Sequence, residues 1–206
     1  MSTPPKDNVD YKCNLITIGD STVGKTSLLC QYMGQKNPLK QVATVGIDYF
    51  TKDIIIDNKN IRVRFWDTAG QERYRSITDN FFKNANGIVL VFDINARESF
   101  DNLKIWIQSV NLKVNNTNIK RILLGNKTDL ERNVSFEEGE AFAKEHGFVY
   151  FETSAKDNVN IQNAFDFLIN EVYKAGVLVL QTEIEVKKAS IDFTPIKQKK
   201  VKKECC

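Results

Sequence analysis

Short apolar runs alternate along the chain with longer segments in which apolar residues recur at helical spacing. The apolar runs predict strands at residues 13–18, 47–56, 61–66, 88–92, 121–124 and 148–151. Residues 57–60, Asp-Asn-Lys-Asn, form a polar turn between the second and third runs, so these two strands are expected to make an antiparallel hairpin. The alternation of the other strands with helices is typical of a mostly parallel sheet.

Helices are expected between these strands. One covers residues 27–32, a second begins at Ser99, and the clearest has apolar residues at i, i+3, i+4 and i+7 over 161–172. Ser135 and Glu138 have the spacing of a capping box, and Gly147 is placed to end the helix that follows them. The predicted fold class is α/β: a single domain whose six-stranded, mostly parallel sheet, with its second strand antiparallel, is flanked by about five helices.

The domain is expected to span residues 11–176, between a flexible N-terminal segment, 1–10, and a variable basic tail, 177–206. The apolar run 177–180 fits two interpretations, because it could extend the last helix or lie against the body. Residues 197–206 hold five Lys and one Glu and so supply +4, which leaves −1 for the rest of a chain whose net charge is +3. A near-neutral body argues against nucleic-acid binding, and the tail is expected to have a role of its own.

The apolar fraction of 42 % is enough to fill one core, and no apolar run approaches the roughly 18 residues of a membrane-spanning helix. Residues 1–10 lack the apolar centre of a signal peptide, so we expect a cytosolic protein. In that compartment Cys13 and Cys30, which lie in apolar surroundings, are expected to be buried thiols rather than a disulfide.

The first motif with chemistry is Gly-Asp-Ser-Thr-Val-Gly-Lys-Thr at residues 19–26, which follows a predicted strand and precedes a predicted helix. This pattern is typical of a loop whose backbone N–H groups surround phosphates, with Lys25 neutralising the β- and γ-phosphates and the Thr26 hydroxyl binding Mg²⁺. The expected contacts of the loop with a nucleotide are made by Ser21, Thr22, Val23, Gly24, Lys25, Thr26 and Ser27.

A second motif, Asp-Thr-Ala-Gly-Gln at residues 67–71, comes directly after the third predicted strand. Asp67 is placed to hold a water bound to Mg²⁺, and the N–H of Gly70 can reach the γ-phosphate. Gln71 is expected to orient the water that attacks this phosphate.

The third motif, Asn126-Lys127-Thr128-Asp129, selects the base. It follows a predicted strand at the edge of the sheet where ligands bind in such folds. Asp129 can accept hydrogen bonds from both N1–H and the 2-amino group of guanine, while adenine offers neither donor and leaves a carboxylate unpaired. The stem of Lys127 can cover the base, and Ser154-Ala155-Lys156 can offer a backbone N–H to guanine O6. The alternative from a different functional class is a P-loop kinase or ATPase. Asn126 and Asp129 argue against it, because they favour guanine over adenine.

These motifs, in this order over residues 11–176, resemble those of the Ras superfamily of small GTPases. The resemblance implies a P-loop GTPase fold with GTP or GDP and Mg²⁺ as cofactors. Thr44, eighteen residues after Thr26, then corresponds to the Thr of switch I that binds Mg²⁺ and contacts the γ-phosphate. The implied metal ligands are Thr26, Thr44 and Asp67, and the implied catalytic residues are Gln71, Lys25 and Thr44.

The sequence shows no residue assignable as an arginine finger, so hydrolysis should be slow and raised roughly 10³–10⁵-fold by a GTPase-activating protein. Such activators of this family supply both an Arg and a Gln, so Gln71 could be displaced in the assisted reaction. A switch that only binds and exchanges nucleotide is the second alternative, and the presence of Gln71, Thr44 and Gly70 argues against it.

Within the superfamily the chain is most similar to the Rab branch. Residues 44–48, Trp66 before the second motif, residues 73–77 and the terminal Cys205-Cys206 resemble Rab segments. The resemblance implies a regulator of vesicle traffic on the cytosolic face of intracellular membranes, with a soluble cytosolic pool, prenylated at both terminal cysteines. It implies an effector surface at Tyr49, Trp66 and Phe81, and a monomer whose partners are an exchange factor, a GTPase-activating protein, a GDP-dissociation inhibitor, a Rab escort protein with geranylgeranyl transferase, and effectors.

Two positions depart from the Rab pattern. Asn37 stands where switch I usually begins with a Phe that contacts guanine. Loss of this contact should cost on the order of 1 kcal/mol or more, so we expect faster loss of nucleotide unless Leu39 or Tyr32 compensates. Tyr49 stands where the effector surface usually has Phe, with Phe50 adjacent, which is expected to alter effector choice.

Overall fold

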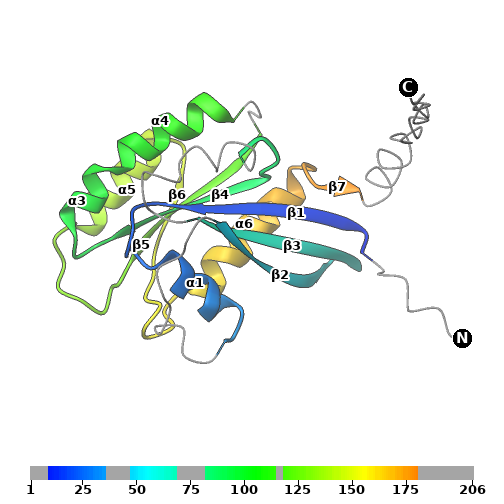
Figure 1. The fold of residues 1–206 in the computed structure, drawn as a ribbon, viewed down its shortest axis with the longest axis horizontal. Coiled ribbons are helices and arrows are strands. Elements are labelled where there is room, and N and C mark those ends of the chain that lie inside the picture. The colour runs from blue at the N-terminus through cyan, green and yellow to red at the C-terminus, as the bar shows by residue number, and fades with distance from the viewer. Residues whose placement is uncertain (1–8, 36–46, 69–81, 115–117, 181–206) are drawn as a thin grey trace, which may run out of the picture.

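The structure is a computed structural model, and it describes residues 9–35, 47–68, 82–114 and 118–180. One twisted sheet forms its centre (Figure 1), with the strand order β2-β3-β1-β4-β5-β6. The strands are β1 (Tyr11–Ile18), β2 (Ile47–Ile56), β3 (Lys59–Thr68), β4 (Gly87–Asp93), β5 (Lys120–Asn126) and β6 (Val149–Glu152). Neighbouring strands on this path are parallel except β2 and β3, so the predicted α/β class and antiparallel second strand are confirmed.

The β2–β3 hairpin turns more tightly than the polar run 57–60 predicted. Only Asp57 and Asn58 lie outside the strands, because Ile56 already pairs with Lys59. Asp57 and Asn58 have φ angles of 51° and 58°, the left-handed conformation that Asp and Asn tolerate and that two-residue hairpin loops require. The prediction of a polar turn was therefore right, and the predicted length of four residues was wrong.

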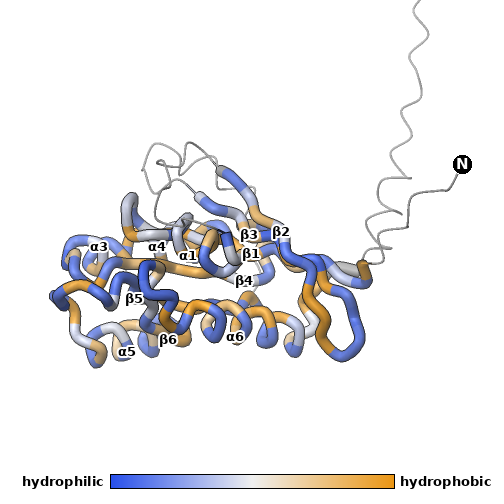
Figure 2. Tube along the Cα trace, turned by 90° about the horizontal axis from the view of Figure 1, so that it is seen from below, coloured by the Kyte–Doolittle hydropathy of each residue, from blue (hydrophilic) through white to orange (hydrophobic). Residues whose placement is uncertain are grey.

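Helices cover both faces of the sheet. One face carries α1 (Lys25–Tyr32) and α6 (Ile161–Lys174), whose apolar residues share a core cluster with alternate residues of β1 and β3. The other face carries α3 (Arg97–Asp101), α4 (Leu103–Lys113) and α5 (Phe136–Glu145), which pack on the remaining apolar side chains of β1, β4 and β5. Figure 2 shows hydrophobic residues concentrated along the central strands, while α5 and α6 alternate between hydrophobic and hydrophilic positions.

The ends of α5 form as the sequence predicts. Ser135 Oγ accepts a hydrogen bond from the backbone N–H of Glu138 at 3.1 Å, and Glu138 Oε2 accepts one from the N–H of Ser135 at 3.0 Å. This reciprocal pair is the predicted capping box. Gly147 follows the last turn with φ 73°, a left-handed conformation that ends the helix.

The run 177–180 lies against the body rather than extending α6. Residues Val179–Leu180 form a seventh strand, β7, antiparallel to β1, with Val179 opposite Lys12 and Leu180 opposite Tyr11. Asn86 holds the approach to this strand: its Nδ2 donates to the Val177 carbonyl at 2.6 Å, and its Oδ1 accepts from the backbone N–H of Asn14 at 2.7 Å. Backbone pairing continues in this way past Gly176, where the sequence predicted the domain to end.

Cys13 and Cys30 are buried free thiols, as predicted, and burial raises the pKa of both above the ordinary value. Among the helices that the structure describes, none combines the length and the apolar character needed to cross a membrane.

Candidate functional site

The loop between β1 and α1 requires glycine at both ends. Gly19 has φ 139°, and a Cβ at this position would lie 2.1 Å from the carbonyl oxygen of Val91. Gly24 has φ 100°, and its Cβ would lie 2.3 Å from Nδ2 of Asn126. L-residues rarely adopt these angles and here they would also clash, so the glycines allow the backbone to turn close to β4 and β5. Lys25 and Thr26 then begin the helix instead of preceding it.

Lys25 is a buried cation in this loop, with 5 % of its surface exposed. Its Nζ donates to the carbonyl oxygens of Gly19 at 2.9 Å and Asp20 at 2.6 Å. Burial lowers the pKa of Lys25 to about 8, and the nearby carboxylates of Asp67 and Asp20 oppose this effect. The loop therefore holds a largely dehydrated positive charge, which favours an anionic ligand.

Thr26 and Asp67 lie in contact at the ends of α1 and β3. Thr26 Oγ1 donates to Asp67 Oδ2 at 2.5 Å, and Asp67 is buried. A hydroxyl and a carboxylate beside a phosphate-binding loop are the oxygen donors that Mg²⁺ prefers, so these residues fit the metal expected from the sequence. Within the described ranges no group of three His, Cys, Asp or Glu side chains is arranged to hold a metal by itself.

A cavity of about 240 Å³ adjoins the loop. Its lining consists of Thr22, Gly24, Ser27, Asn126, Lys127, Asp129, Ala155 and Lys156. Asn126, which is buried, ties the surrounding segments together: its Nδ2 donates to the Val23 carbonyl at 2.8 Å, and its Oδ1 accepts from the backbone N–H of Ala155 at 3.3 Å. The structure thus brings the first and third motifs and residues 154–156 into one site.

Asp129 presents an ionised carboxylate to this cavity. Ser154 Oγ donates to Asp129 Oδ1 at 2.6 Å, and Lys156 Nζ lies 3.6 Å from Oδ2. The hydrogen bond from Ser154 is the main cause that lowers the pKa of Asp129, with burial opposing it. Asp129 is therefore available as an acceptor at neutral pH, and Ser154 orients it.

Lys127 is held by a residue that the sequence analysis did not single out. Its Nζ forms an ion pair with Asp93 Oδ2 at 2.6 Å, and Asp93 is buried at the end of β4. Lys127 itself has φ 68°, an uncommon conformation for a residue with a side chain. This ion pair restricts the lysine stem, which lines the cavity.

Tyr32 does not line the cavity, so the suggestion that it could replace the missing switch I aromatic is wrong. It lies at the end of α1 with 4 % of its surface exposed, and its ring packs against Phe65 and Phe165. Its hydroxyl donates to Asp166 Oδ1 at 2.8 Å. The apolar side of α1 turns this ring into the core, away from the base site.

Other residues of the sequence predictions lie outside the described residues: Asn37, Leu39, Thr44, Gly70, Gln71, Phe81, Cys205 and Cys206.

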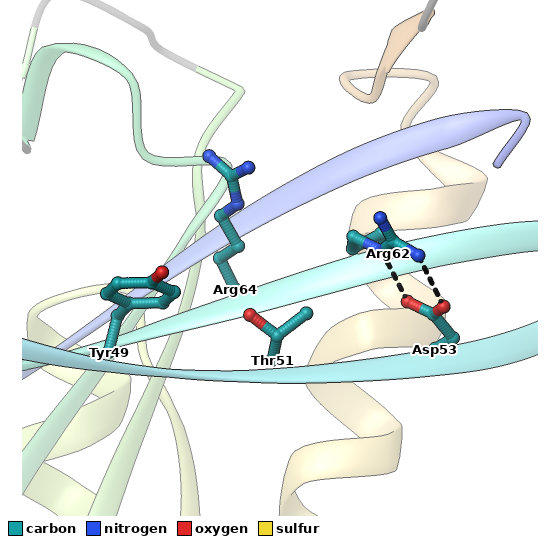
Figure 3. Close-up of a pocket in the computed structure, with 5 residues that line it drawn as sticks. All are labelled: Tyr49, Thr51, Asp53, Arg62 and Arg64. Atoms are coloured by element: carbon teal, nitrogen blue, oxygen red, sulfur yellow. Dashed lines mark hydrogen bonds and ion pairs between the residues drawn. The ribbon is translucent and has the colours of Figure 1, made fainter. Parts of the chain in front are cut away.

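Tyr49 and Trp66 are opposite each other across the β2–β3 hairpin, with ring centroids 5.4 Å apart. Tyr49 is 57 % exposed, although it is large and aromatic. A hollow of about 360 Å³ adjoins the pair. Figure 3 shows its lining, in which Tyr49, Thr51 and Asp53 of β2 lie beside Arg62 and Arg64 of β3. Arg62 is paired with both carboxylate oxygens of Asp53 at 2.8 Å. The two aromatic residues therefore lie at one end of a surface that is partly apolar and that Arg62 and Arg64 make partly basic.

The comparisons with known proteins agree with this arrangement. Residues 14–174 match the model of the Ras family. The GTP-binding protein ypt2 of Schizosaccharomyces pombe is 42 % identical over 170 residues, which cover 82 % of this chain and 84 % of that protein. Ras-related protein Rab-11B of Dictyostelium discoideum is 42 % identical over 166 residues, 80 % of this chain and 75 % of that protein. Ras-related protein RABA5c of Arabidopsis thaliana is 38 % identical over 175 residues, 84 % of this chain and 81 % of that protein.

Proposed function

This chain belongs to the Ras family, as a Rab-type small GTPase of vesicle traffic, and from that premise we propose that it switches between GDP- and GTP–Mg²⁺-bound states at the site described above. The observation that carries the proposal is the buried Lys25, held 2.9 Å and 2.6 Å from two loop carbonyls beside a cavity that Asp129 lines. A dehydrated cation and an ionised carboxylate in adjoining spaces suit a ligand with phosphates at one end and hydrogen-bond donors at the other.

The base is guanine in this proposal. Asp129 accepts from N1–H and the 2-amino group, and Ser154 keeps the carboxylate oriented while Lys127 covers the base. Adenine would offer the carboxylate neither of these donors, and sites of this kind reject the wrong ligand by roughly 10⁴-fold. A P-loop kinase or ATPase is therefore disfavoured by the same residue that orients guanine.

The phosphates lie in the glycine loop, where Lys25 neutralises their charge. Thr26 and Asp67 would hold Mg²⁺, with Thr44 added by family resemblance, and the bound ion supplies positive charge to the β- and γ-phosphate oxygens. Gln71 is proposed to orient the attacking water, and Gly70 to contact the γ-phosphate. Release of phosphate frees Thr44 and Gly70 from this ligand, and the resulting change in the switch segments is the signal.

The proposed partners rest on exposed Tyr49, on the partly buried Trp66 beside it, and on the resemblance. Tyr49 and Trp66, with Phe81, are proposed to contact effectors in the GTP-bound state. Prenylation of Cys205 and Cys206 is proposed to attach the protein to the cytosolic face of an intracellular membrane, because two lipid chains hold a protein stably where one does not. The exchange factor, the activating protein, the dissociation inhibitor and the escort protein with its transferase belong to the same proposal.

The nucleotide content of the purified protein tests the proposal. Denaturation and chromatography should release GDP at close to one per chain, and a Lys25→Ala variant should be empty, because its loop has lost the buried cation. Bound adenine nucleotide would contradict the proposal. Single-turnover assays with added GTP then distinguish a switch that hydrolyses GTP from one that only exchanges nucleotide. Slow release of phosphate by the parent protein, absent from a Gln71→Leu variant, supports hydrolysis. No release of phosphate by the parent protein supports a switch that only exchanges.

A further inference from the structure

The second residue of the phosphate loop, Asp20, is held from outside the loop by α4. Trp106 Nε1 donates to Asp20 Oδ1 at 2.7 Å, and Asn102 Nδ2 donates to Asp20 Oδ2 at 2.8 Å. Asn102 precedes the first residue of α4 and Trp106 lies one turn later, so both donors are on the same side of the helix. Trp106 is 3 % exposed, so its N–H is shielded from water. Each oxygen of the carboxylate therefore receives its own directed donor.

The same residue also positions the buried lysine. The backbone carbonyl of Asp20 accepts from Lys25 Nζ at 2.6 Å, the shorter of the two contacts that hold this ammonium. Hydrogen bonds to a carboxylate are stronger and more directional than neutral ones. By fixing the side chain of Asp20, the two donors fix the orientation of the peptide group to which Lys25 is bonded. The chain of contacts runs from α4 through Asp20 to the cation.

Asp20 also presents an electrostatic problem that the two donors reduce. Its carboxylate lies in a loop that receives phosphates, and two negative charges at close range repel each other strongly where water is excluded. Asn102 and Trp106 draw the carboxylate toward α4 and disperse its charge over two N–H groups. Without them the carboxylate would be free to turn toward the nucleotide.

We propose that Asn102 and Trp106 are positioning residues for the nucleotide phosphates, which slow the release of GDP by clamping Asp20. This inference rests on the proposed nucleotide binding and deepens it. It assigns to α4 a role in retention of the nucleotide, although neither Asn102 nor Trp106 is among the residues that line the base cavity.

The test is a comparison of GDP release from the Mg²⁺–GDP complex. Trp106→Phe keeps an aromatic ring in the core but removes the N–H donor together with part of the indole volume. It should release GDP about 10-fold faster, which corresponds to about 1.4 kcal/mol. In an Asp20→Ala background the same substitution should change release by less than about twofold, because the acceptor is already gone. Equal acceleration in both backgrounds would overturn the proposal.

A matched control separates the clamp from general loosening of the fold. Phe142→Leu disturbs the apolar cluster that contains Trp106 without touching Asp20. It should lower the melting temperature as much as Trp106→Phe or more, and leave GDP release unchanged. If the two variants accelerate release equally for an equal loss of thermal stability, the clamp is refuted.

A second readout uses inosine diphosphate, which lacks the 2-amino group that Asp129 would accept. The clamp acts on the phosphates, so Trp106→Phe should accelerate the release of both nucleotides by the same factor and preserve their ratio. A changed ratio would place the effect at the base instead. Failure of the parent protein to hold GDP at all is a distinct result, which would overturn the proposed function and the clamp with it.

Discussion

Replacement of the phosphate-loop lysine should stabilise the nucleotide-free fold while it abolishes nucleotide binding. Burial lowers the pKa of Lys25 from 10.5 to about 8, which corresponds to a penalty of roughly 3 kcal/mol for keeping the charged form in the native state. Lys25→Met removes this penalty with a side chain of similar length. It also leaves the carbonyl oxygens of Gly19 and Asp20 without their donor, which costs about 1–3 kcal/mol. The expected net gain in the free energy of unfolding is on the order of 1 kcal/mol near neutral pH.

The pH dependence gives this prediction its sign. Below about pH 8 Lys25 is charged in both states, and the parent protein bears the whole penalty. Between about 8 and 10.5 the native state loses its proton first, so the parent's free energy of unfolding rises with pH. Because Met does not titrate, the advantage of Lys25→Met should shrink across this window.

Urea unfolding of the nucleotide-free proteins at about pH 7 and about pH 9.5 measures the difference. The exposed Lys83 provides a control, since Lys83→Met should show no comparable gap that closes with pH. GDP should raise the melting temperature of the parent and leave that of Lys25→Met unchanged. A Lys25→Met variant that is less stable than the parent at neutral pH, or whose difference from it does not shrink at the higher pH, would refute the reasoning about burial.

Three further substitutions address the base, the loop and the scaffold. Asp129→Asn should weaken GDP binding by up to about 10⁴-fold in a competition assay, because the amide replaces one of the two acceptor oxygens with an NH₂ donor that faces a guanine donor, and unchanged affinity would contradict the assigned role. Gly24→Ala should leave the far-UV circular dichroism near that of the parent but abolish bound nucleotide in the purified protein, because the Cβ meets Asn126 at 2.3 Å; full occupancy would show that the loop can relax. Ser135→Ala should lower the free energy of unfolding by about 1 kcal/mol in urea through loss of the cap of α5, and a change in GDP release would count against a purely structural role.

Local patterns predicted most of the fold because most of its elements are decided locally. The apolar run of β2 was predicted at both of its ends, and the cap of α5 was predicted from two residues three positions apart. Strand β7 could not be predicted in this way. Its two residues have no periodicity of their own, and their conformation depends on Tyr11, Lys12 and Asn86, far earlier in the chain.

The candidate site shows the same division. Lys25, Thr26, Asp67 and Asp129 were found because each belongs to a short motif with fixed spacing. Ser154 was found in the same way, but Asp93, Asn102 and Trp106 were missed, because each is distant in sequence from the residue that it holds. Asn102 and Trp106 meet Asp20 at separations of 82 and 86 residues. A Trp or Asn on a helix reads from sequence as part of a core or a surface, and only the tertiary structure shows where its N–H points.

Tyr32 was misjudged for a related reason. Its place just after the loop motif suggested that it could reach the base, but the short helix α1 turns it into the core cluster on this face of the sheet. There its hydroxyl meets Asp166, 134 residues later. Proximity in sequence to a binding loop says little about the direction in which a helix of eight residues turns its last side chain.

The pairing of β7 with β1 has a mechanical consequence. Leu180 leaves the body beside Tyr11, while the phosphate loop follows Ile18 at the other end of the same strand, about 23 Å away at the usual rise per residue. A force applied to the chain beyond Leu180 would therefore act first on β1, because it would separate β7 from Tyr11 and Lys12. The hydrogen bond from Asn86 to the Val177 carbonyl would break next. The strand under this force, β1, is the one that leads into the nucleotide loop. Helix α6, which precedes β7, would come under force only after the hydrogen bond between Asn86 and Val177 had broken.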